Sequence, residues 1–220
     1  MSIEQREMTV RALVLTARDS GIAGKRLEIV TRERGRMVVF VPQGRRIRQR
    51  IGALLPGSRI DLTLRQDAAG WQAVQAEGRI LVDVFAWSYE DWLCYYAYPA
   101  WLDELFPSEE EEPELYRLTA DYLSALATKH MVISTLIACW QAAVIAGYDP
   151  MVLAAKGQLP LDDTGREALR LMLEYPWRQA PAVTWRSATV MRLAQTLIYF
   201  SRYHVGIEVA ALDELVKEKY

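Results

Sequence analysis

The first 82 residues contain five short runs with strand-like patterning, separated by polar turns, and this spacing most constrains the fold. The runs cover residues 9–16, 26–32, 37–41, 58–65 and 71–82. Alternation with a period of two is typical of strands, because successive side chains point to opposite faces of a sheet. Gly21, Gly35 and Gly70 lie in the breaks, where turns need glycine. Five strands joined by short turns predict a small closed barrel rather than a sandwich.

The first of these runs is mixed but largely apolar on both faces. One face carries Val10, Ala12 and Val14, and the other carries Arg11, Leu13 and Leu15. A strand at the surface of a barrel would show polar residues on its outer face. We therefore expect residues 9–16 to be buried largely on both sides.

After residue 84 the apolar residues change to helical spacing. The expected helices cover residues 86–105, 114–127, 130–146, 164–173, 186–204 and 208–218. No unit of 20 to 50 residues recurs, which favours a bundle over a solenoid. We predict an α+β protein with a five-stranded oligonucleotide-binding (OB) barrel over residues 1–84, followed by an all-α helical domain over residues 85–220. The OB fold is the commonest small barrel that also carries a basic, ligand-binding face.

One helical segment is apolar enough to raise the question of a membrane. Residues 131–147 carry no charge for 17 positions, but they include Ser134, Thr135 and Gln141. This length is at the lower limit for spanning a bilayer, and no second such segment follows. We predict a buried central helix and no membrane contact. The N-terminus is too polar for a signal peptide, so a cytoplasmic location is expected.

An aromatic run opens the helical region. It contains Trp87, Tyr89, Trp92, Tyr95, Tyr96, Tyr98 and Trp101. Such a run can stack bases, but acidic neighbours such as Glu90 and Asp103 would repel phosphate. Packing of the barrel against the helices is therefore the preferred interpretation.

Charge is distributed unevenly along the chain. Residues 1–82 carry 15 basic and 8 acidic side chains, a net charge of +7, whereas residues 83–220 carry 11 and 20, a net charge of −9. The basic part includes Arg45, Arg46, Arg48 and Arg50 in one predicted loop. Arginine offers a permanent charge and a planar set of donors that match phosphate. The pattern indicates binding to a nucleic-acid backbone, although a basic loop can also be an ordinary solvated loop.

Neither the cysteines nor the histidines form a recognisable catalytic or metal motif. Cys94 and Cys139 are too far apart in sequence for a metal-ligand pair and are expected to be reduced, buried thiols. His130 and His204 have no nucleophile nearby in sequence. We predict a protein that is not an enzyme and has no cofactor and no metal.

Four segments together resemble a family of bacterial DNA-repair proteins, the recombination mediator RecO. Residues 14–36 end in Thr31-Arg32-Glu33-Arg34-Gly35-Arg36, which is similar to the family's T-x-E-x-G-(K/R) hairpin. Residues 44–56 are similar to its G-A-R and G-A-L-Q-P loop, with Arg at the Ala position and a shorter interval. Residues 146–150 fit L-G-Y-x-P, and residues 203–215 resemble the family's Y-x-x-(H/Y)-L-G tail. The resemblance spans nearly the whole chain in the right order.

The resemblance implies a function in DNA repair and recombination. RecO-like proteins bind single-stranded DNA, anneal complementary strands and help to load recombinase at single-strand gaps. The implied partners are single-stranded DNA, a RecR-like protein and the C-terminal tail of a single-stranded-DNA-binding protein, and the implied location is the bacterial cytoplasm, in association with the nucleoid. The candidate phosphate-binding residues are Lys25, Arg26, Arg34, Arg36, Arg45, Arg46, Arg48 and Arg50, with little sequence preference expected. The alternative for each is an ordinary surface charge.

Two departures from the family pattern affect what can be carried over. Many members hold a zinc site of four cysteines after the Gly-Tyr-x-Pro element, but residues 151–181 contain no cysteine. The family's central helix usually carries a Glu and an Arg, whereas residues 138–144 are uncharged. Two other functions stay open: a non-catalytic protein-interaction adaptor with weak nucleic-acid binding, and an RNA-binding OB module.

Overall fold

The computed structural model describes residues 7–21, 24–42, 54–107, 109–128, 130–179 and 184–217. By their internal contacts these residues form two compact units. The first unit combines Met1–Phe85 with Ser108–Ala127, and the second combines Ala86–Pro107 with Thr128–Tyr220. The chain therefore leaves the first unit, enters the second, and returns to the first for one helix.

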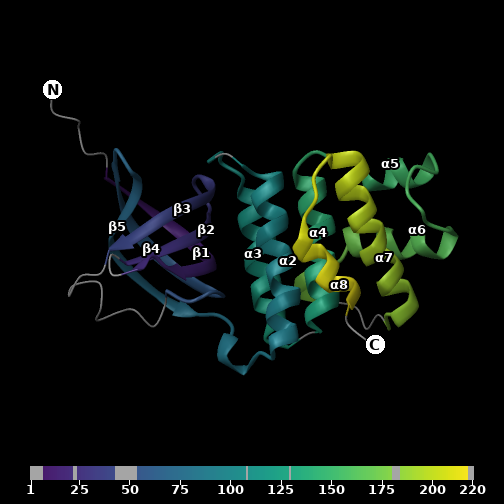
Figure 1. The fold of residues 1–220 in the computed structure, drawn as a ribbon, viewed down its shortest axis with the longest axis horizontal. Coiled ribbons are helices and arrows are strands. Elements are labelled where there is room, and N and C mark those ends of the chain that lie inside the picture. The colour runs from purple at the N-terminus through teal and green to yellow at the C-terminus, as the bar shows by residue number, and fades with distance from the viewer. Residues whose placement is uncertain are drawn as a thin grey trace. The chain divides into compact units, whose positions relative to one another are not determined.

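The first unit contains a closed five-stranded barrel, as the turn spacing predicts (Figure 1). Its strands are β1 (Glu7–Asp19), β2 (Gly24–Thr31), β3 (Gly35–Pro42), β4 (Ser58–Asp67) and β5 (Gly70–Ile80). They follow one another around the barrel in the order β1-β2-β3-β5-β4. All neighbours are antiparallel except β3 and β5, which pair in parallel and close the barrel. The five-stranded OB barrel and the helical region after it are both confirmed.

The barrel interior is filled by the side chains that point inward from each strand. The core cluster includes Val10, Ala12 and Val14 from β1, with Leu27, Ile29, Met37, Val39, Val41, Ile60, Leu62, Leu64, Trp71 and Ala73 from the other strands. A bulge between Val14 and Thr16 shifts the register of β1 against β2. Leu13 is fully buried but is outside this core cluster. Residues 12–16 of β1 are thus buried on both faces, as predicted, whereas Thr9 and Arg11 of the predicted stretch are exposed.

Helix α3 (Pro113–Leu126) explains the burial of the outer face. It contacts β1, β2 and β3, and Figure 1 shows it beside these strands. Pro113 occupies its first turn, where a missing N–H costs nothing. Its buried residues recur at helical spacing and include Leu115, Leu118 and Tyr122. Helix α3 comes after the predicted boundary at residue 84, yet it packs in the barrel's unit because the outer face of the sheet is apolar there.

The second unit is built from helices around α4. Its main elements are α2 (Tyr89–Leu105), α4 (Met131–Ile145), α5 (Pro150–Ala155), α6 (Asp163–Leu173) and α7 (Ser187–Phe200). The chain continues through a π-helical turn (Ser201–Val205), a 3-10 turn (Ala210–Asp213) and α8 (Glu214–Lys217). Short 3-10 turns also occur at Val84–Ala86 and Trp177–Gln179.

Helix α4 is the buried central helix that the sequence predicts. It contacts α2, α6 and α7, and most of its residues are buried. Trp101 of α2 donates a 2.9 Å hydrogen bond from its indole nitrogen to the carbonyl oxygen of Cys139 on α4. Phe200 of α7 contacts the rings of both Trp101 and Trp140. In the described part of the chain, no helix is long and apolar enough to cross a membrane.

The aromatic run forms a cluster within the helical unit. Trp87, Trp92, Tyr95 and Tyr96 contact one another with ring centroids 4.9 to 5.9 Å apart. Tyr89 lies outside the cluster and is exposed. The predicted role of these rings in packing the barrel against the helices stays a prediction.

Candidate nucleic-acid interface

The predicted arginine loop lies outside the residues that the structure describes. Arg45, Arg46, Arg48 and Arg50 all fall between residues 43 and 53. Their role in phosphate binding therefore stays a prediction. The geometry of the interface is built from the remaining candidates.

The other four candidates divide between two ends of the β2–β3 ladder. Arg26 pairs with Phe40 across the ladder, near the β1–β2 turn. Arg36 pairs with Val30, next to the β2–β3 turn that contains Arg34. Four residues along β3 separate the two positions, which is about 13 Å at the usual rise of a strand. The candidates therefore form two groups rather than one patch.

Arg34 is engaged by a carboxylate of its own unit. Its guanidinium lies 5.3 Å from the centroid of the Trp71 ring, a distance suited to a cation–π contact. Its Nε lies 3.7 Å from Oε2 of Glu109, which is an ion pair but too long for a hydrogen bond. The same carboxylate oxygen accepts a 2.9 Å hydrogen bond from the Trp71 indole. Arg34, Trp71 and Glu109 therefore form one local network.

The segment that supplies Glu109 lies directly on the β2–β3 turn. Gly35 has a φ of +60°, and a Cβ at this position would collide with the carbonyl oxygen of Glu110. Only a glycine allows this approach, because a Cβ at residue 35 would lie well inside van der Waals contact with that oxygen. Arg36, the next residue, is only 8% exposed. Arg34 thus lies against the acidic segment, residues 109–112, and Arg36 is buried.

Lys25 and Arg26 lie in more open surroundings. Lys25 pairs with Asp19 at 3.4 Å across the turn between β1 and β2. Arg26 is exposed, and within the described chain no carboxylate lies at ion-pair distance from it. Its neighbour across the β1–β2 ladder is Arg18, whose side chain is 69% exposed. Arg18 is a candidate that the sequence analysis missed.

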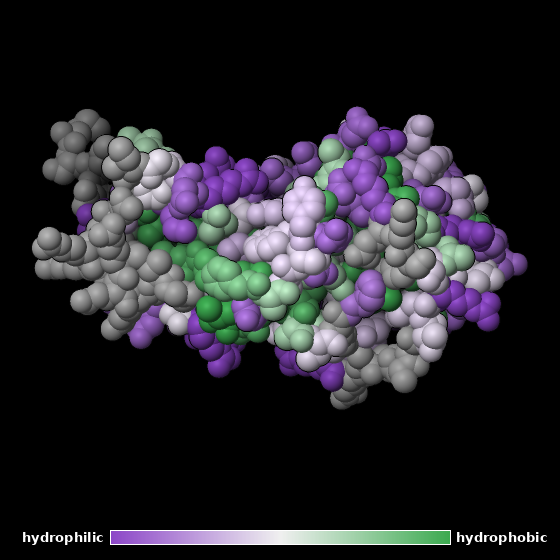
Figure 2. Space-filling view, turned by 60° about the horizontal axis from the view of Figure 1, so that its bottom comes forward, coloured by the Kyte–Doolittle hydropathy of each residue, from purple (hydrophilic) through white to green (hydrophobic). Residues whose placement is uncertain are grey.

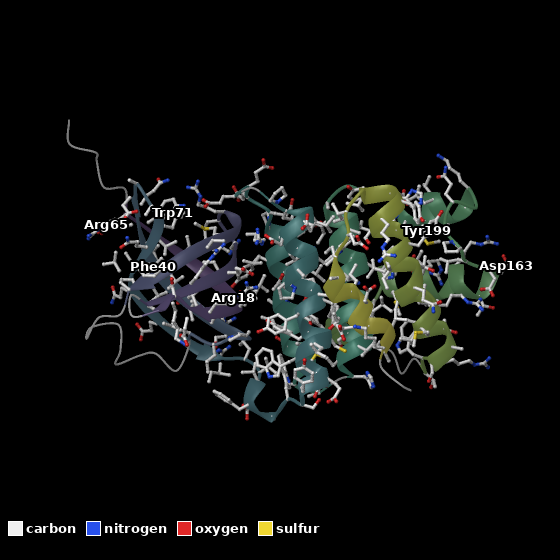
Figure 3. All side chains as sticks on the ribbon, viewed as in Figure 1. Arg18, Phe40, Arg65, Trp71, Asp163 and Tyr199 are labelled. Atoms are coloured by element: carbon white, nitrogen blue, oxygen red, sulfur yellow. The ribbon has the colours of Figure 1, made fainter. Side chains whose placement is uncertain are left out.

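Phe40 completes this row of side chains. It lies opposite Arg26 on one side and opposite Gln72 of β5 on the other. Met37, Val39 and Val41 of the same strand belong to the barrel core. Alternation therefore directs Phe40 to the outer face of the barrel, where it is half-buried (Figure 3). The row Arg18, Arg26, Phe40 and Gln72 is named the open row below.

Two further arginines lie opposite each other on β4 and β5. Arg59 and Arg79 are paired in the register of these strands, and like charges in this position repel. Burial raises the pKa of Tyr116 on α3, and the charge of Arg59 acts in the opposite direction. Arg59 therefore lies close enough to α3 to interact with its tyrosine.

The assignment of α3 to the barrel's unit changes the charge balance. Residues 1–85 and 108–127 together carry 16 basic and 15 acidic side chains, a net charge of +1. The excess of +7 in residues 1–82 is thus almost cancelled within the same unit, chiefly by glutamates 109–112. Positive potential on this unit must be local rather than general.

A groove of about 570 Å³ lies in the helical unit, between α6 and the start of α7. Asp163, Glu167, Trp185 and Arg186 are among its lining residues. Both carboxylates are already paired within α6, Asp163 with Arg166 and Glu167 with Arg170. The surface of the unit around α6 is largely hydrophilic (Figure 2).

The geometry shows no recognisable catalytic constellation in the described residues. No group of three His, Cys, Asp or Glu side chains comes together there as a candidate metal site. His204 contacts the carbonyl oxygen of Gln158 at 3.0 Å, and His130 precedes the first residue of α4. Complete burial raises the pKa of the Cys139 thiol well above its usual range, which disfavours the reactive thiolate.

Comparison with known proteins identifies the barrel. Residues 1–77 match the family model described as "Recombination protein O N terminal". This match supports the resemblance noted in the sequence for that part of the chain. No curated protein matches the chain.

Proposed function

We propose, from the match of residues 1–77 to the RecO family, that this chain acts in DNA recombination and repair as a single-stranded-DNA-binding mediator. In this proposal the barrel binds the sugar-phosphate backbone of one strand without strong sequence preference. The protein then anneals complementary strands and helps to load recombinase at single-strand gaps. It acts through binding and not through catalysis.

The exposed basic row on the barrel is the observation that carries this proposal. Arg18 and Arg26 lie side by side in register, and Arg26 has no carboxylate partner among the described residues. Two guanidinium groups opposite each other on neighbouring strands repel, and an anionic ligand relieves that repulsion. The face of strands 2 and 3 is the general ligand-binding face of OB barrels.

The partners of the proposed function are a RecR-like protein and the acidic C-terminal tail of a single-stranded-DNA-binding protein. The family match supports both. The charges of the helical unit offer less support for the tail, because Arg192 pairs with Asp162 and Arg202 pairs with Glu208. Arg186, which lines the groove beside α6, and Lys156 have no ion pair among the described residues. The proposed setting is the bacterial cytoplasm, in association with the nucleoid.

A protein-interaction adaptor is the alternative with an observation in its favour. The acidic segment nearly cancels the charge of the barrel's unit, and strong backbone binding needs a surplus of positive charge. An adaptor would bind nucleic acid weakly or not at all. An RNA-binding module is the other alternative, since phosphate contacts alone do not distinguish DNA from RNA.

One binding experiment tests the proposal against both alternatives. Fluorescence anisotropy of the full chain would be measured with single-stranded DNA, single-stranded RNA and duplex DNA of equal length, at two salt concentrations. We expect single-stranded DNA to bind more tightly than duplex and to weaken as salt rises. Tighter binding of RNA would favour the RNA module. Absence of binding to all three at low salt would leave the adaptor.

A further inference from the structure

The outer face of β1, β2 and β3 is divided into a covered half and an open half. In the covered half, Leu13 and Val30 are fully buried and Arg36 is 8% exposed. Helix α3 contacts all three strands, and the acidic segment adds its backbone next to Gly35. In the open half, Arg18 and Arg26 are exposed. A ligand on this face would meet only the open half.

Phe40 has the position of a stacking platform in that open half. It projects outward between Arg26 and Gln72, and it is half-buried rather than covered. Val74, further along β5, is also on the outer surface and is 39% exposed. A strand residue that faces water is normally polar. An aromatic ring there, next to two arginines, matches the way single strands are held, with bases on rings and phosphates on cations.

Charge selects the occupant of this surface. The open row carries Arg18 and Arg26, and Glu28 lies 3.9 Å from Arg18, a weak ion pair. Glu28 is itself mostly buried, with a side chain that is 13% exposed. Lys25 lies at the same end of β2, although Asp19 pairs with it. At the other end of the row, Gln72 donates a 2.5 Å hydrogen bond to Oδ2 of Asp67. Arg26, next to Arg18, is therefore the exposed charge of the row that has no carboxylate partner among the described residues, and an acidic polymer with flat apolar groups complements it.

We propose that a single strand of nucleic acid crosses the open row, with one base stacked on Phe40 and neighbouring phosphates bound by Arg18 and Arg26. Arg34 and Arg36 then hold the acidic segment and α3 on the barrel and do not contact the strand. This inference rests on the proposed function, and it names the residues of the barrel that perform it. It assigns Phe40, which basic charge does not identify, and Arg18, which was not among the residues predicted from the sequence.

The test separates the stacking contact from the phosphate contacts. Anisotropy titrations would compare an oligothymidine strand with a strand of equal length made of abasic tetrahydrofuran units, for the full-length protein and for Phe40→Leu. Leucine keeps apolar bulk but offers no ring face. We expect F40L to weaken oligothymidine binding by roughly 5- to 150-fold. Binding of the abasic strand should be unchanged. The Phe40→Trp variant should keep the affinity for oligothymidine, because tryptophan stacks as well.

The arginines provide the second readout. Each lost phosphate contact should reduce the slope of log K against log salt by roughly 0.7 for a single strand. We expect Arg18→Ala and Arg26→Ala each to reduce it, whereas F40L leaves it unchanged. Arg34→Ala is the matched control, and it should leave the slope unchanged.

The outcomes separate this inference from the proposed function. If the unaltered protein binds neither strand, the proposed function fails and the inference fails with it. If the unaltered protein binds oligothymidine but F40L binds it equally well, the stacking inference alone is overturned. A reduced slope in R34A with an unchanged slope in R18A and R26A would place the phosphates on the covered half and overturn it too. Thermal unfolding of each variant would confirm that it is folded.

Discussion

The indole nitrogen of Trp71 donates a 2.9 Å hydrogen bond to Oε2 of Glu109. This bond holds the acidic segment that precedes α3 against the barrel. Trp71 also belongs to the barrel core and is 6% exposed. The bond therefore links the interior of the barrel to an acidic segment outside it. Arg34 shares the same carboxylate.

The first prediction concerns this link. Replacing Glu109 with Ala removes the acceptor of a nearly buried indole N–H and the partner of Arg34. A hydrogen bond to a charged group contributes about 1.5–3 kcal/mol, and partial exposure of Glu109 reduces this, so we expect a loss of about 1–2 kcal/mol. Chemical denaturation would measure it. Glu111→Ala is the control, because Glu111 is exposed and should change stability by less than about 0.5 kcal/mol.

The second prediction tests how closely the acidic segment approaches the barrel. Gly35 and Gly21 have nearly the same φ, +60° and +63°, but only Gly35 lies against a neighbouring backbone atom. Both Gly→Ala changes force an L residue into the left-handed region, at a cost of about 1 kcal/mol. Gly35→Ala should cost at least about 1 kcal/mol more, because the Glu110 carbonyl must move. Equal melting temperatures for the two variants would contradict the close approach.

The third prediction concerns a fragment that ends at residue 84. The sequence favours this boundary, but the fragment lacks α3, which lies on the outer face of β1, β2 and β3. Leu13, Leu15 and Val30 are fully buried in the complete chain. We expect the fragment to bind a dye such as ANS strongly and to unfold at a lower temperature than the full chain. A cooperative transition at an unchanged temperature, without dye binding, would show that α3 is dispensable.

The barrel could be predicted from the sequence because its evidence is local. Turn glycines and alternation mark each strand, and the double-sided pattern of Leu13 and Val14 already indicated a cover on the outer face. The helix that forms this cover could not be identified. The apolar face of α3 fits a bundle as well as a sheet, and sequence order places it after α2. Which surface a helix covers depends on long-range packing that periodicity does not contain.

Only part of the candidate site could be predicted from the sequence, for a related reason. Arg34 and Arg26 look alike in sequence, but Glu109 neutralises only Arg34, and this partner is distant along the chain. Phe40 was missed because residues 37–41 are apolar throughout, so the run itself shows no polar face. The parity of Val39 and Val41 with the inward residues of β2 would have placed Phe40 outside. Arg18 could have been found by the same reasoning about register.

The fourth prediction concerns zinc. Closed structural zinc sites need four ligands, most often cysteine thiolates, and residues 151–181 contain no cysteine. We expect protein purified without added metal to contain no stoichiometric zinc, and chelation to leave its unfolding temperature unchanged. Elemental analysis would measure the first and a thermal melt with EDTA the second. About one zinc ion per chain would mean that ligands other than four cysteines hold it.

The last prediction returns to the arginine loop, Arg45, Arg46, Arg48 and Arg50, which lies outside the described residues. If these arginines contact phosphates, replacing all four with Ala should weaken single-strand binding about uniformly across sequences. Loss of two to four contacts should reduce the slope of log K against log salt by about 1.5 to 3. Stability should change little, because solvated loop charges contribute within about 0.5 kcal/mol each.

The acidic residues of the chain make the opposite result informative. The barrel's own unit already pairs Arg34 with Glu109, so a basic loop could be neutralised in the same way. In that case the quadruple variant should melt at a lower temperature, because unpaired glutamates would then repel one another, while its salt slope stays unchanged. Measuring the slope and the melting temperature on the same variant distinguishes the two. A reduced slope with an unchanged melt assigns the loop to nucleic acid, and the reverse assigns it to the protein's own carboxylates.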